Sequence, residues 1–276
     1  MQTARLGSCW RGAGLRSDCD GRTAGLAEVH SSAIVGPDVT FGPGTKVGPF
    51  CRFEGRVQVG EDCRFRTGVV VGTAPMDRNY LGEDTGVIIG NGNEFHEYTT
   101  IHRSTGKGTN TVIGDNNYIM AYVHIAHNCR IGNSCTVTNG TQLGGYVEVG
   151  NGANLGGMVG VHQFCRIGKL AMVGACSYVN KDIPPFLMAQ GQPCRVRGIN
   201  AVGMKRAGFS DVIINTLKQA FGIIYRSGLN LGQALEQIES GFLSTVKSGK
   251  SREEVQTLIG FIKSSKRGIE LRTGSS

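Results

Sequence analysis

The sequence has no run of about 18 uninterrupted apolar residues, which a membrane-spanning helix requires, so we expect a soluble protein without an integral membrane segment. Only 18% of its 276 residues are charged, whereas glycine occurs 43 times. This combination argues against a helical bundle, and an apolar fraction of 39% argues against disorder throughout. The chain is long enough for one large domain or two modest domains with a core.

The nine cysteines include no Cys-x-x-Cys pair, which weakens a zinc or redox interpretation and favours a reducing compartment. Residues 1–27 also lack the apolar segment of a secretory signal. They carry four arginines among small residues, and we interpret them as an extension that is flexible or resembles a transit peptide. This favours the mitochondrial matrix if the protein is eukaryotic, and the bacterial cytoplasm otherwise.

The net charge of +8 lies almost entirely at the C-terminal end, because residues 185–276 carry 13 basic and six acidic residues. Such an end is either a solvated helical face or a surface for an acidic partner or a phosphate-bearing ligand. We do not expect nucleic acid as the partner, since no aromatic stacking platform is interleaved with the basic residues.

An apolar residue recurs at every sixth position over much of the chain. From Val29 to Val179 this register has 26 positions, and only Asp77, Glu83 and Lys107 are not apolar. Glycine often follows the apolar residue, as in "VGPDVT", "IGNSCT" and "LGGYVE", and we expect Gly and Asn at the tight corners. A period of six matches neither a helix nor a two-faced strand, and it predicts a solenoid with three short strands per coil.

This pattern resembles that of the hexapeptide-repeat proteins, and the resemblance implies a left-handed parallel β-helix for residues 28–190. The register predicts about eight or nine coils of 18 residues. Five cysteines occupy the fifth, inward-facing position of their hexads, and we predict that they pack inside the prism. They are Cys51, Cys63, Cys129, Cys135 and Cys165.

Two polar stretches interrupt the register, residues 72–88 and residues 104–112, and we predict that they are loops that leave the prism. Loops on a rigid scaffold often carry binding groups.

Residues 191–276 have helical apolar spacing, which predicts a C-terminal α-helical domain after the mainly β domain. Ser210 and Asn230 are predicted to cap two of its helices at their N-termini. Ser251 and Glu254 are predicted to form a capping box at the start of a third helix.

Two histidines, His124 and His127, lie three residues apart at one corner of the predicted coil. Their spacing alone is compatible with surface side chains. It is also compatible with zinc ligands, with a third ligand such as His102 or one from a neighbouring chain, as in some hexapeptide-repeat carbonic anhydrases. The residues around the pair favour a third interpretation, an acyl-transfer site.

The string "HIAHNCRIGN" and, further along, "GGMVGVHQFCRIG", "AQGQP" and "GINAVGMKRAGFS" resemble the UDP-N-acetylglucosamine O-acyltransferase family over about residues 27–267. The resemblance implies transfer of a (R)-3-hydroxyacyl group from acyl carrier protein to the 3-hydroxyl of UDP-N-acetylglucosamine, the first step of lipid A biosynthesis. It also implies a homotrimer with clefts between adjacent prisms, no cofactor and no metal, since the acyl group arrives on phosphopantetheine. The basic C-terminal domain would then steer the acidic carrier protein.

The same resemblance assigns roles to individual residues. His127 matches the general base, and the backbone N–H of Gly145 matches the donor to the oxyanion. Positions that contact the substrate are matched by Asp77 and Asn79 in the first loop, by His124, His162 and Gln163 on the prism, and by Asn200 and Arg206 in the helical domain.

Several residues depart from those common in the family. Asn128 follows His127 where Asp is common, and Asn79, Tyr146, Val202 and Ala207 also differ. Ala175 stands where the family often has Gly at the end of the acyl groove, so its methyl group is predicted to shorten the preferred acyl chain. Two other functions therefore remain open, a zinc-dependent carbonic anhydrase-like protein and a nucleotide-sugar-binding scaffold with weakened catalysis.

Overall fold

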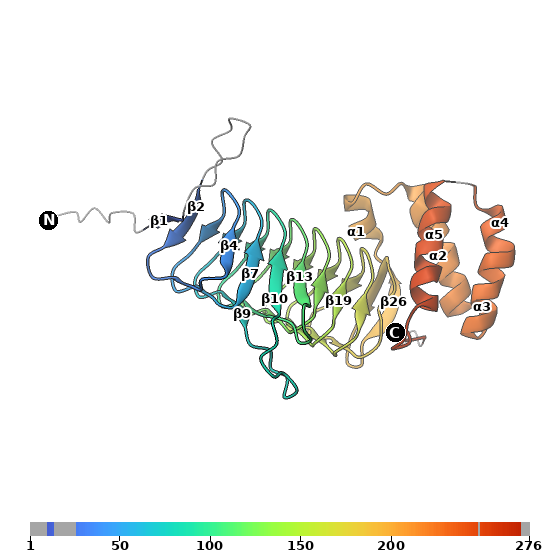
Figure 1. The fold of residues 1–276 in the computed structure, drawn as a ribbon. Coiled ribbons are helices and arrows are strands. Elements are labelled where there is room, and N and C mark those ends of the chain that lie inside the picture. The colour runs from blue at the N-terminus through green and yellow to red at the C-terminus, as the bar shows by residue number, and fades with distance from the viewer. Residues whose placement is uncertain (1–9, 14–25, 248, 272–276) are drawn as a thin grey trace.

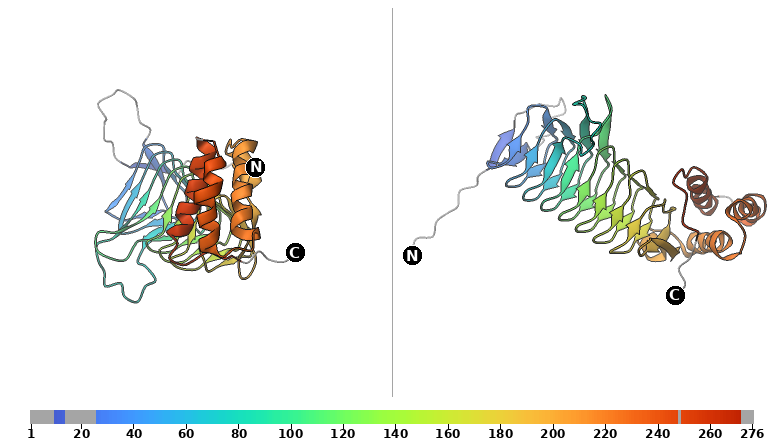
Figure 2. Two further views of the ribbon diagram at one scale, coloured as in Figure 1. Left: turned by 90° about the vertical axis from the view of Figure 1, so that its right-hand side faces the viewer. Right: turned by 90° about the horizontal axis from the view of Figure 1, so that it is seen from below.

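A triangular prism of short parallel strands makes up most of the molecule. The computed structural model describes residues 10–13, 26–247 and 249–271. It confirms the left-handed parallel β-helix, with the helices placed beyond the last coil (Figure 1). Figure 2 shows the coils stacked one behind another along the prism, with the first coils and the helices at opposite ends.

Each coil contributes one strand to each of three faces. Face I contains β2 (Ala27–His30), β5 (Lys46–Val47), β8 (Arg64–Phe65), β11 (Glu94–Phe95), β14 (Tyr118–Ile119), β17 (Thr136–Val137), β20 (Asn154–Leu155) and β23 (Met172–Val173). Face II contains β3 (Ile34–Val35), β6 (Arg52–Phe53), β9 (Val70–Thr73), β12 (Thr100–His102), β15 (His124–Ile125), β18 (Gln142–Leu143), β21 (Gly160–Val161) and β24 (Tyr178–Val179). Face III contains β4 (Val39–Phe41), β7 (Arg56–Val59), β10 (Gly86–Ile89), β13 (Asn110–Ile113), β16 (Arg130–Ile131), β19 (Glu148–Val149) and β22 (Arg166–Ile167). We name each edge of the prism by the two faces that it joins.

The side chains at the six-residue register positions form the core of the prism. Every apolar register position from Val47 to Val179 is buried, and stacked positions pair at a spacing of 18 residues, as Ile125 does with Leu143. The first coil is more open, since Val35 is 39% exposed. The eight strands of faces I and II agree with the lower of the two predicted coil numbers.

Both interruptions of the register leave the prism at edge II–III, and both are shorter than predicted. The first loop spans residues 74–85, because β9 continues to Thr73 and β10 begins at Gly86; Figure 1 shows a long loop leaving the prism near β9. The second loop spans residues 103–109, because β13 begins at Asn110. Register positions lie 18 residues apart across the first loop and 12 across the second, which are multiples of six, so the sequence period survives both insertions.

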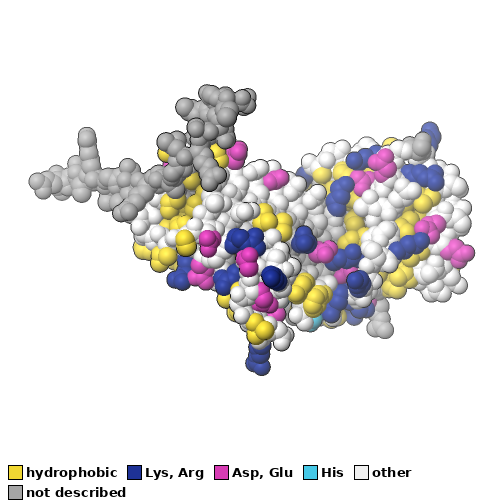
Figure 3. Space-filling model, in the orientation of Figure 1, with side chains coloured by type: hydrophobic (Ala, Val, Ile, Leu, Met, Phe, Trp, Pro, Cys, Tyr) yellow, Lys and Arg dark blue, Asp and Glu magenta, His cyan; other side chains and the backbone are white. Residues whose placement is uncertain are grey.

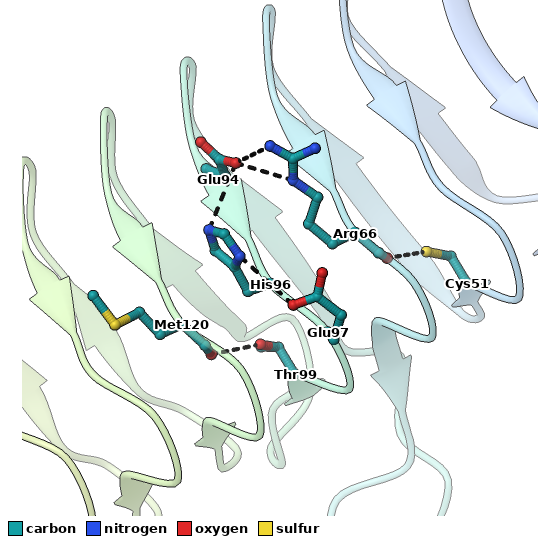
Figure 4. Close-up of polar contacts among 7 residues, drawn as sticks. All are labelled: Cys51, Arg66, Glu94, His96, Glu97, Thr99 and Met120. Atoms are coloured by element: carbon teal, nitrogen blue, oxygen red, sulfur yellow. Dashed lines mark hydrogen bonds and ion pairs between the residues drawn. The ribbon is translucent and has the colours of Figure 1, made fainter.

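The fifth position of a hexad links successive coils as well as filling the core. The thiol of Cys51 donates to the carbonyl of Arg66 at 2.9 Å, and the hydroxyl of Thr99 donates to that of Met120 at 3.1 Å (Figure 4). The five cysteines predicted to pack inside are all buried, which confirms that prediction. On the outside of the same region, Figure 4 shows the carboxylate of Glu94 between the guanidinium of Arg66 and the ring of His96.

Tight corners do not require glycine or asparagine, contrary to the expectation from sequence. Tyr122, Tyr146, Met158 and Phe164 all adopt φ values between 58° and 65°. Each such residue costs about 1–2 kcal/mol in this region. Hydrogen bonds between coils hold the corners in place, as when the N–H of Tyr146 donates to the carbonyl of His127 at 3.0 Å.

The prism ends in an antiparallel pair, so the predicted domain boundary at residue 191 falls inside a β-structure. Strand β25 (Leu187–Gln190) pairs in parallel with β23 and antiparallel with β26 (Arg195–Ile199). At the other end, β1 (Trp10–Ala13), four residues of the N-terminal extension, pairs antiparallel with β2. The other residues before 26 lie outside the described residues.

The helical domain contains α1 (Ala201–Arg206), α2 (Asp211–Arg226), α3 (Leu231–Gln237), a π-helical segment η1 (Ile238–Phe242), α4 (Leu243–Thr245) and α5 (Lys250–Lys263). Ser210 and Asn230 cap α2 and α3 as predicted, because their side chains accept hydrogen bonds from backbone N–H groups of the first turn. Within the described ranges, no helix is long and apolar enough to cross a membrane.

The predicted capping box of Ser251 and Glu254 is wrong. Helix α5 already begins at Lys250, and its N-cap, Gly249, has no side chain to accept a hydrogen bond. Glu254 is instead buried at 3% exposure, where it binds the ammonium group of Lys169 on the prism at 3.0 Å. A carboxylate that looked like a local helix signal therefore joins the two domains.

Candidate active site

Edge II–III brings together several of the residues that the sequence singled out. Both loops leave the prism there, and the corners that follow carry His127, Gly145 and Gln163 in the same place on successive coils. Because equivalent positions in neighbouring coils lie about 4.8 Å apart, these three residues form one short column.

The hydrogen bonds of Asn128 fix the orientation of the His127 ring. The amide nitrogen of Asn128 donates to the carbonyl of Thr105 at 3.0 Å, and its oxygen accepts from the N–H of Thr105 at 2.9 Å. The same oxygen lies 2.9 Å from Nδ1 of His127. Since this oxygen can only accept, Nδ1 carries the proton and Nε2 carries the lone pair.

The backbone of Gly145 packs against the Cε1 and Nε2 atoms of the His127 ring. A Cβ atom at Gly145 would lie 2.7 Å from both Cε1 and Nε2 of His127, so any larger residue would collide with the imidazole. The N–H of Gly145 has no acceptor in the part of the chain that the structure describes. A backbone N–H without an acceptor among the described residues thus belongs to a glycine that packs directly against the basic nitrogen of His127.

His124 and His102 lie close to His127, in strands β15 and β12 of face II. Nδ1 of His124 lies 2.8 Å from the hydroxyl of Thr100, and the rings of His102 and His124 meet edge to face at 4.9 Å. Burial, with the nearby imidazoles, lowers the pKa of His102 to about 4 and lowers the pKa of His124. Both rings are therefore neutral near pH 7. Among the described residues, no three His, Cys, Asp or Glu side chains are grouped to hold a metal ion.

A cavity of about 480 Å³ runs along the face III side of the edge. Its lining includes Asn128, Tyr146, Phe164, Arg166, Asp182 and Arg267. Tyr146 meets the His127 ring at 5.4 Å and stacks on Phe164 at 4.8 Å, so an aromatic wall leads away from the histidine. His162 lies at the far end, where Nη2 of Arg267 is 2.8 Å from its Nδ1.

The remaining predicted site residues do not meet His127 within one chain. Asp77 and Asn79 lie in the first loop, where the Asp77 carboxylate accepts from the N–H of Asn79 at 2.9 Å. Ala175 is exposed on edge I–II. Asn200 caps α1 and donates to the carbonyl of Leu170 on edge III–I at 2.9 Å, and the exposed Arg206 ends the same helix.

Sequence reasoning missed two contacts at this site. Asn128 was noted only as a departure from the family, whereas its bonds to Thr105 depend on a loop 23 residues away. Arg267 reaches His162 from 105 residues away, and no spacing in the sequence indicates that contact. Cys129, Cys135 and Cys165 are not suited to act as nucleophiles, since burial raises the pKa of Cys129 to about 12 and the pKa values of Cys135 and Cys165 to about 11.

Comparison with known proteins agrees with this geometry. The family model for UDP-N-acetylglucosamine O-acyltransferase domain 2 matches residues 182–270, and that for bacterial transferase hexapeptide repeats matches residues 110–145. The acyl-[acyl-carrier-protein]–UDP-N-acetylglucosamine O-acyltransferase of Halorhodospira halophila is 45% identical over 72% of this chain and 75% of its own. The Gloeothece citriformis enzyme of that name is also 45% identical, and the match spans 62% of each chain.

Solved structures extend the likeness over the helical domain. The UDP-N-acetylglucosamine acyltransferase of Campylobacter jejuni has a TM-score of 0.77 and 31% identity, covering 89% of this chain and 98% of its own. The Arabidopsis enzyme has a TM-score of 0.74 and 32% identity, covering 87% and 99%. The fold and these matches therefore place the chain among the hexapeptide-repeat proteins. More narrowly, the chain belongs to the UDP-N-acetylglucosamine O-acyltransferase family.

Proposed function

We propose that this protein transfers a (R)-3-hydroxyacyl group from acyl carrier protein to the 3-hydroxyl of UDP-N-acetylglucosamine, the first step of lipid A biosynthesis. The observation that carries the proposal is the close packing at edge II–III of His127, whose Nε2 carries the lone pair, against Gly145, whose backbone N–H has no acceptor among the described residues. The family membership favours this function over a zinc lyase.

In the proposed reaction His127 acts as the base and the N–H of Gly145 stabilises the oxyanion. Nε2 of His127 takes the proton of the sugar hydroxyl as that oxygen attacks the thioester carbonyl. The oxyanion that forms accepts a hydrogen bond from the N–H of Gly145. When the carbon–sulfur bond breaks, the His127 imidazolium returns its proton to the leaving thiolate, so no acyl-enzyme forms and no cofactor is needed.

Asn128 can orient the base but cannot neutralise its charge. Its amide oxygen accepts from Nδ1 of His127 in both the neutral and the protonated ring, whereas an Asp would add a negative charge beside the imidazolium. Compared with an Asp, Asn128 therefore preserves the correct tautomer of His127 but stabilises its imidazolium less.

The direct test is a thioester assay with UDP-N-acetylglucosamine and a panel of hydroxyacyl carrier proteins of different chain lengths. We expect O-acylated sugar nucleotide and free carrier-protein thiol in equal amounts with at least one donor. Binding of the sugar nucleotide without turnover of any donor would contradict the proposal and would favour a scaffold with weakened catalysis.

We infer that the complete site needs more than one copy of the chain, as a homotrimer would supply. Support comes from the placement of the predicted site residues on different edges of one prism: His127 on edge II–III, Ala175 on edge I–II and Asn200 against edge III–I. A rigid prism cannot bring its own edges together, but the edges of adjacent prisms can meet.

A row of exposed apolar side chains on edge I–II supports this inference. Phe50, Tyr98, Tyr122 and Met158 are between 51% and 70% exposed, and the Tyr98 and Tyr122 rings stack at 5.3 Å. We name these four residues the edge I–II ridge. A continuous apolar surface of this kind is typical of a protein–protein interface.

Subunit mixing tests the shared site. His127→Ala and Arg206→Met chains, each weakly active alone, are co-expressed and purified together through different tags. If His127 of one chain works with Arg206 of another, mixed trimers regain intact sites and part of the wild-type rate. No gain in rate would show that both residues serve the same chain's site.

The basic helical domain is proposed to dock the acidic carrier protein, and Figure 3 shows Lys and Arg side chains spread over its visible face, with acidic ones between them. Raising the salt concentration should then increase KM for the acyl carrier protein more than KM for the sugar nucleotide.

For localisation, we propose the mitochondrial matrix in a eukaryote and the cytoplasm in a bacterium, on the basis of the arginines in residues 1–27. Expression of residues 1–27 fused to a fluorescent protein in a eukaryotic cell, followed by imaging, tests the first alternative. Diffuse cytosolic fluorescence would contradict it.

A further inference from the structure

The tail that follows α5 returns to the prism and is fixed there by its own backbone. The carbonyl of Gly268 accepts from the N–H of Asp182 at 2.9 Å, and Ile269 forms a parallel bridge with the same residue. The hydroxyl of Ser265 donates to the Asp182 carboxylate at 2.7 Å, and Ile269 is only 6% exposed. Arg267 therefore leaves the backbone from a defined position.

A second anchor joins the end of α5 to face III. The guanidinium of Arg166 binds the carboxylate of Asp182 at 3.1 Å, donates to the carbonyl of Phe261 at 3.1 Å and lies over the Phe261 ring at 4.4 Å. Asp182 is only 1% exposed, and a buried carboxylate with this many donors holds its neighbours firmly.

Arg267 uses this fixed position to bind His162. Its Nη2 lies 2.8 Å from Nδ1 of His162 and 3.3 Å from the carbonyl of Asn180. A guanidinium only donates, so Nδ1 of His162 must accept and carries no proton. The same Nδ1 lies 3.1 Å from the carbonyl of Gln163, but it cannot donate to that oxygen while it accepts from Arg267.

We propose that Arg267 is a positioning residue that holds His162 in its Nε2–H tautomer. His162 then offers a hydrogen-bond donor to an acceptor oxygen of the bound substrate and does not act as a second base. Two histidines of one edge are thereby held in opposite tautomers: Asn128 leaves Nε2 of His127 free to accept, and Arg267 makes Nε2 of His162 a donor. The substrate side of this inference rests on the proposed acyltransferase function, whereas the tautomer does not.

Nitrogen–proton correlation spectra of the ¹⁵N-histidine-labelled full chain test the tautomer directly. The chain has six histidines, and the spectrum of a His162→Gln variant identifies the signals of His162. We expect the Nε2–H pattern in the wild type and a mixture of tautomers in Arg267→Met, which keeps an unbranched side chain but has no donors. Lys266→Met removes a neighbouring charge and should leave the His162 pattern unchanged.

A wild-type His162 with its proton on Nδ1 would overturn the proposal, as would an unchanged His162 pattern in Arg267→Met. Neither result depends on catalysis, so both can be distinguished from a failure of the proposed function, which would appear as absent turnover in the wild type.

Kinetics then separate positioning from a structural role. Losing one aligned hydrogen bond should raise KM for UDP-N-acetylglucosamine about threefold to tenfold in Arg267→Met, with a smaller change in kcat. Arg267→Lys should recover part of the loss, because its ammonium also donates. An equal effect on KM for the acyl donor, with no recovery by lysine, would contradict positioning of His162.

Discussion

Two edges of the same prism have nearly the same backbone and very different surfaces. Corners on edge I–II and on edge II–III both place non-glycine residues at φ close to 60°, as at Tyr122 and Asn128. Edge I–II carries the exposed apolar ridge, whereas edge II–III carries both loops, His127, His162 and the cavity. The inward register fixes the prism, and the corner positions are free to specialise, one edge for chemistry and another for association.

The largest expected effect comes from removing the base on edge II–III. His127→Ala should lower kcat about 10²- to 10⁴-fold, because proton transfer by a positioned group contributes about that much. Acyl transfer from carrier protein, measured at saturating substrate, checks this value. His30→Gln changes a histidine in the first coil and should retain the wild-type rate. Equal rates for His127→Ala and the wild type would refute the assignment of the base.

Introducing a charge into the edge I–II ridge should break association. Tyr122→Asp would bury an unpaired carboxylate between copies, which costs several kcal/mol, so the variant should sediment as a smaller species and lose activity. Analytical ultracentrifugation measures the mass. Ser134→Asp introduces the same charge at an exposed corner on edge III–I of the same coil and should keep the wild-type mass. An unchanged mass for Tyr122→Asp would mean that the ridge is not an interface.

Edge III–I contacts the helical domain through the ion pair between Lys169 and Glu254. Glu254→Ala removes the carboxylate that binds the half-exposed ammonium of Lys169 and should lower the free energy of unfolding by about 1–3 kcal/mol. Urea unfolding followed by circular dichroism measures the change. Glu253→Ala, on the exposed side of the same helix, is the control and should cost under about 0.5 kcal/mol. Similar values for both variants would contradict the role of Glu254 as the link between domains.

The free energy of unfolding should depend on pH through His102, the buried histidine of face II. Burial lowers the pKa of His102 from 6.5 to about 4, so the unfolded chain binds the proton more readily between those values. The stability that neutral His102 contributes is therefore fully present above pH 6.5 and falls by about 3 kcal/mol as the pH drops to 4.

His102→Gln removes this titration. Its free energy of unfolding, measured in urea from pH 4 to 7, should fall less steeply on acidification than that of the wild type. Parallel curves for the two proteins would show that His102 is not held neutral in the fold.

The smallest effect is expected at Ala175 on edge I–II. Replacing it with Gly removes one methyl group and should shift preference toward longer acyl chains. The ratio of kcat/KM for two donors that differ by one methylene should change about fourfold. A panel of hydroxyacyl carrier proteins provides the measurement, and unchanged selectivity would contradict a role for Ala175 in setting chain length.

The prism is more predictable from the sequence than the elements around it. The register from Val29 to Val179 predicted the coils and the buried cysteines, because a period-six pattern has to bury one residue per strand. Ser210 and Asn230 were found as caps because capping is local. The predicted capping box of Ser251 and Glu254 was wrong for the opposite reason, because Glu254 forms a tertiary ion pair with Lys169 instead of a local hydrogen bond. The family resemblance supplied the hand of the helix and the role of His127.

The sequence by itself determined the inside of the prism, where each hexad repeats the same short-range requirement to bury an apolar side chain. Only the tertiary structure decided which nitrogen of each histidine holds its proton. Asn128 needs the loop at Thr105 to fix His127, and His162 needs Arg267 from the far end of the chain. Hydrogen bonds between residues so distant in sequence depend on how the coils stack and where the tail docks, and no local pattern in the chain specifies either.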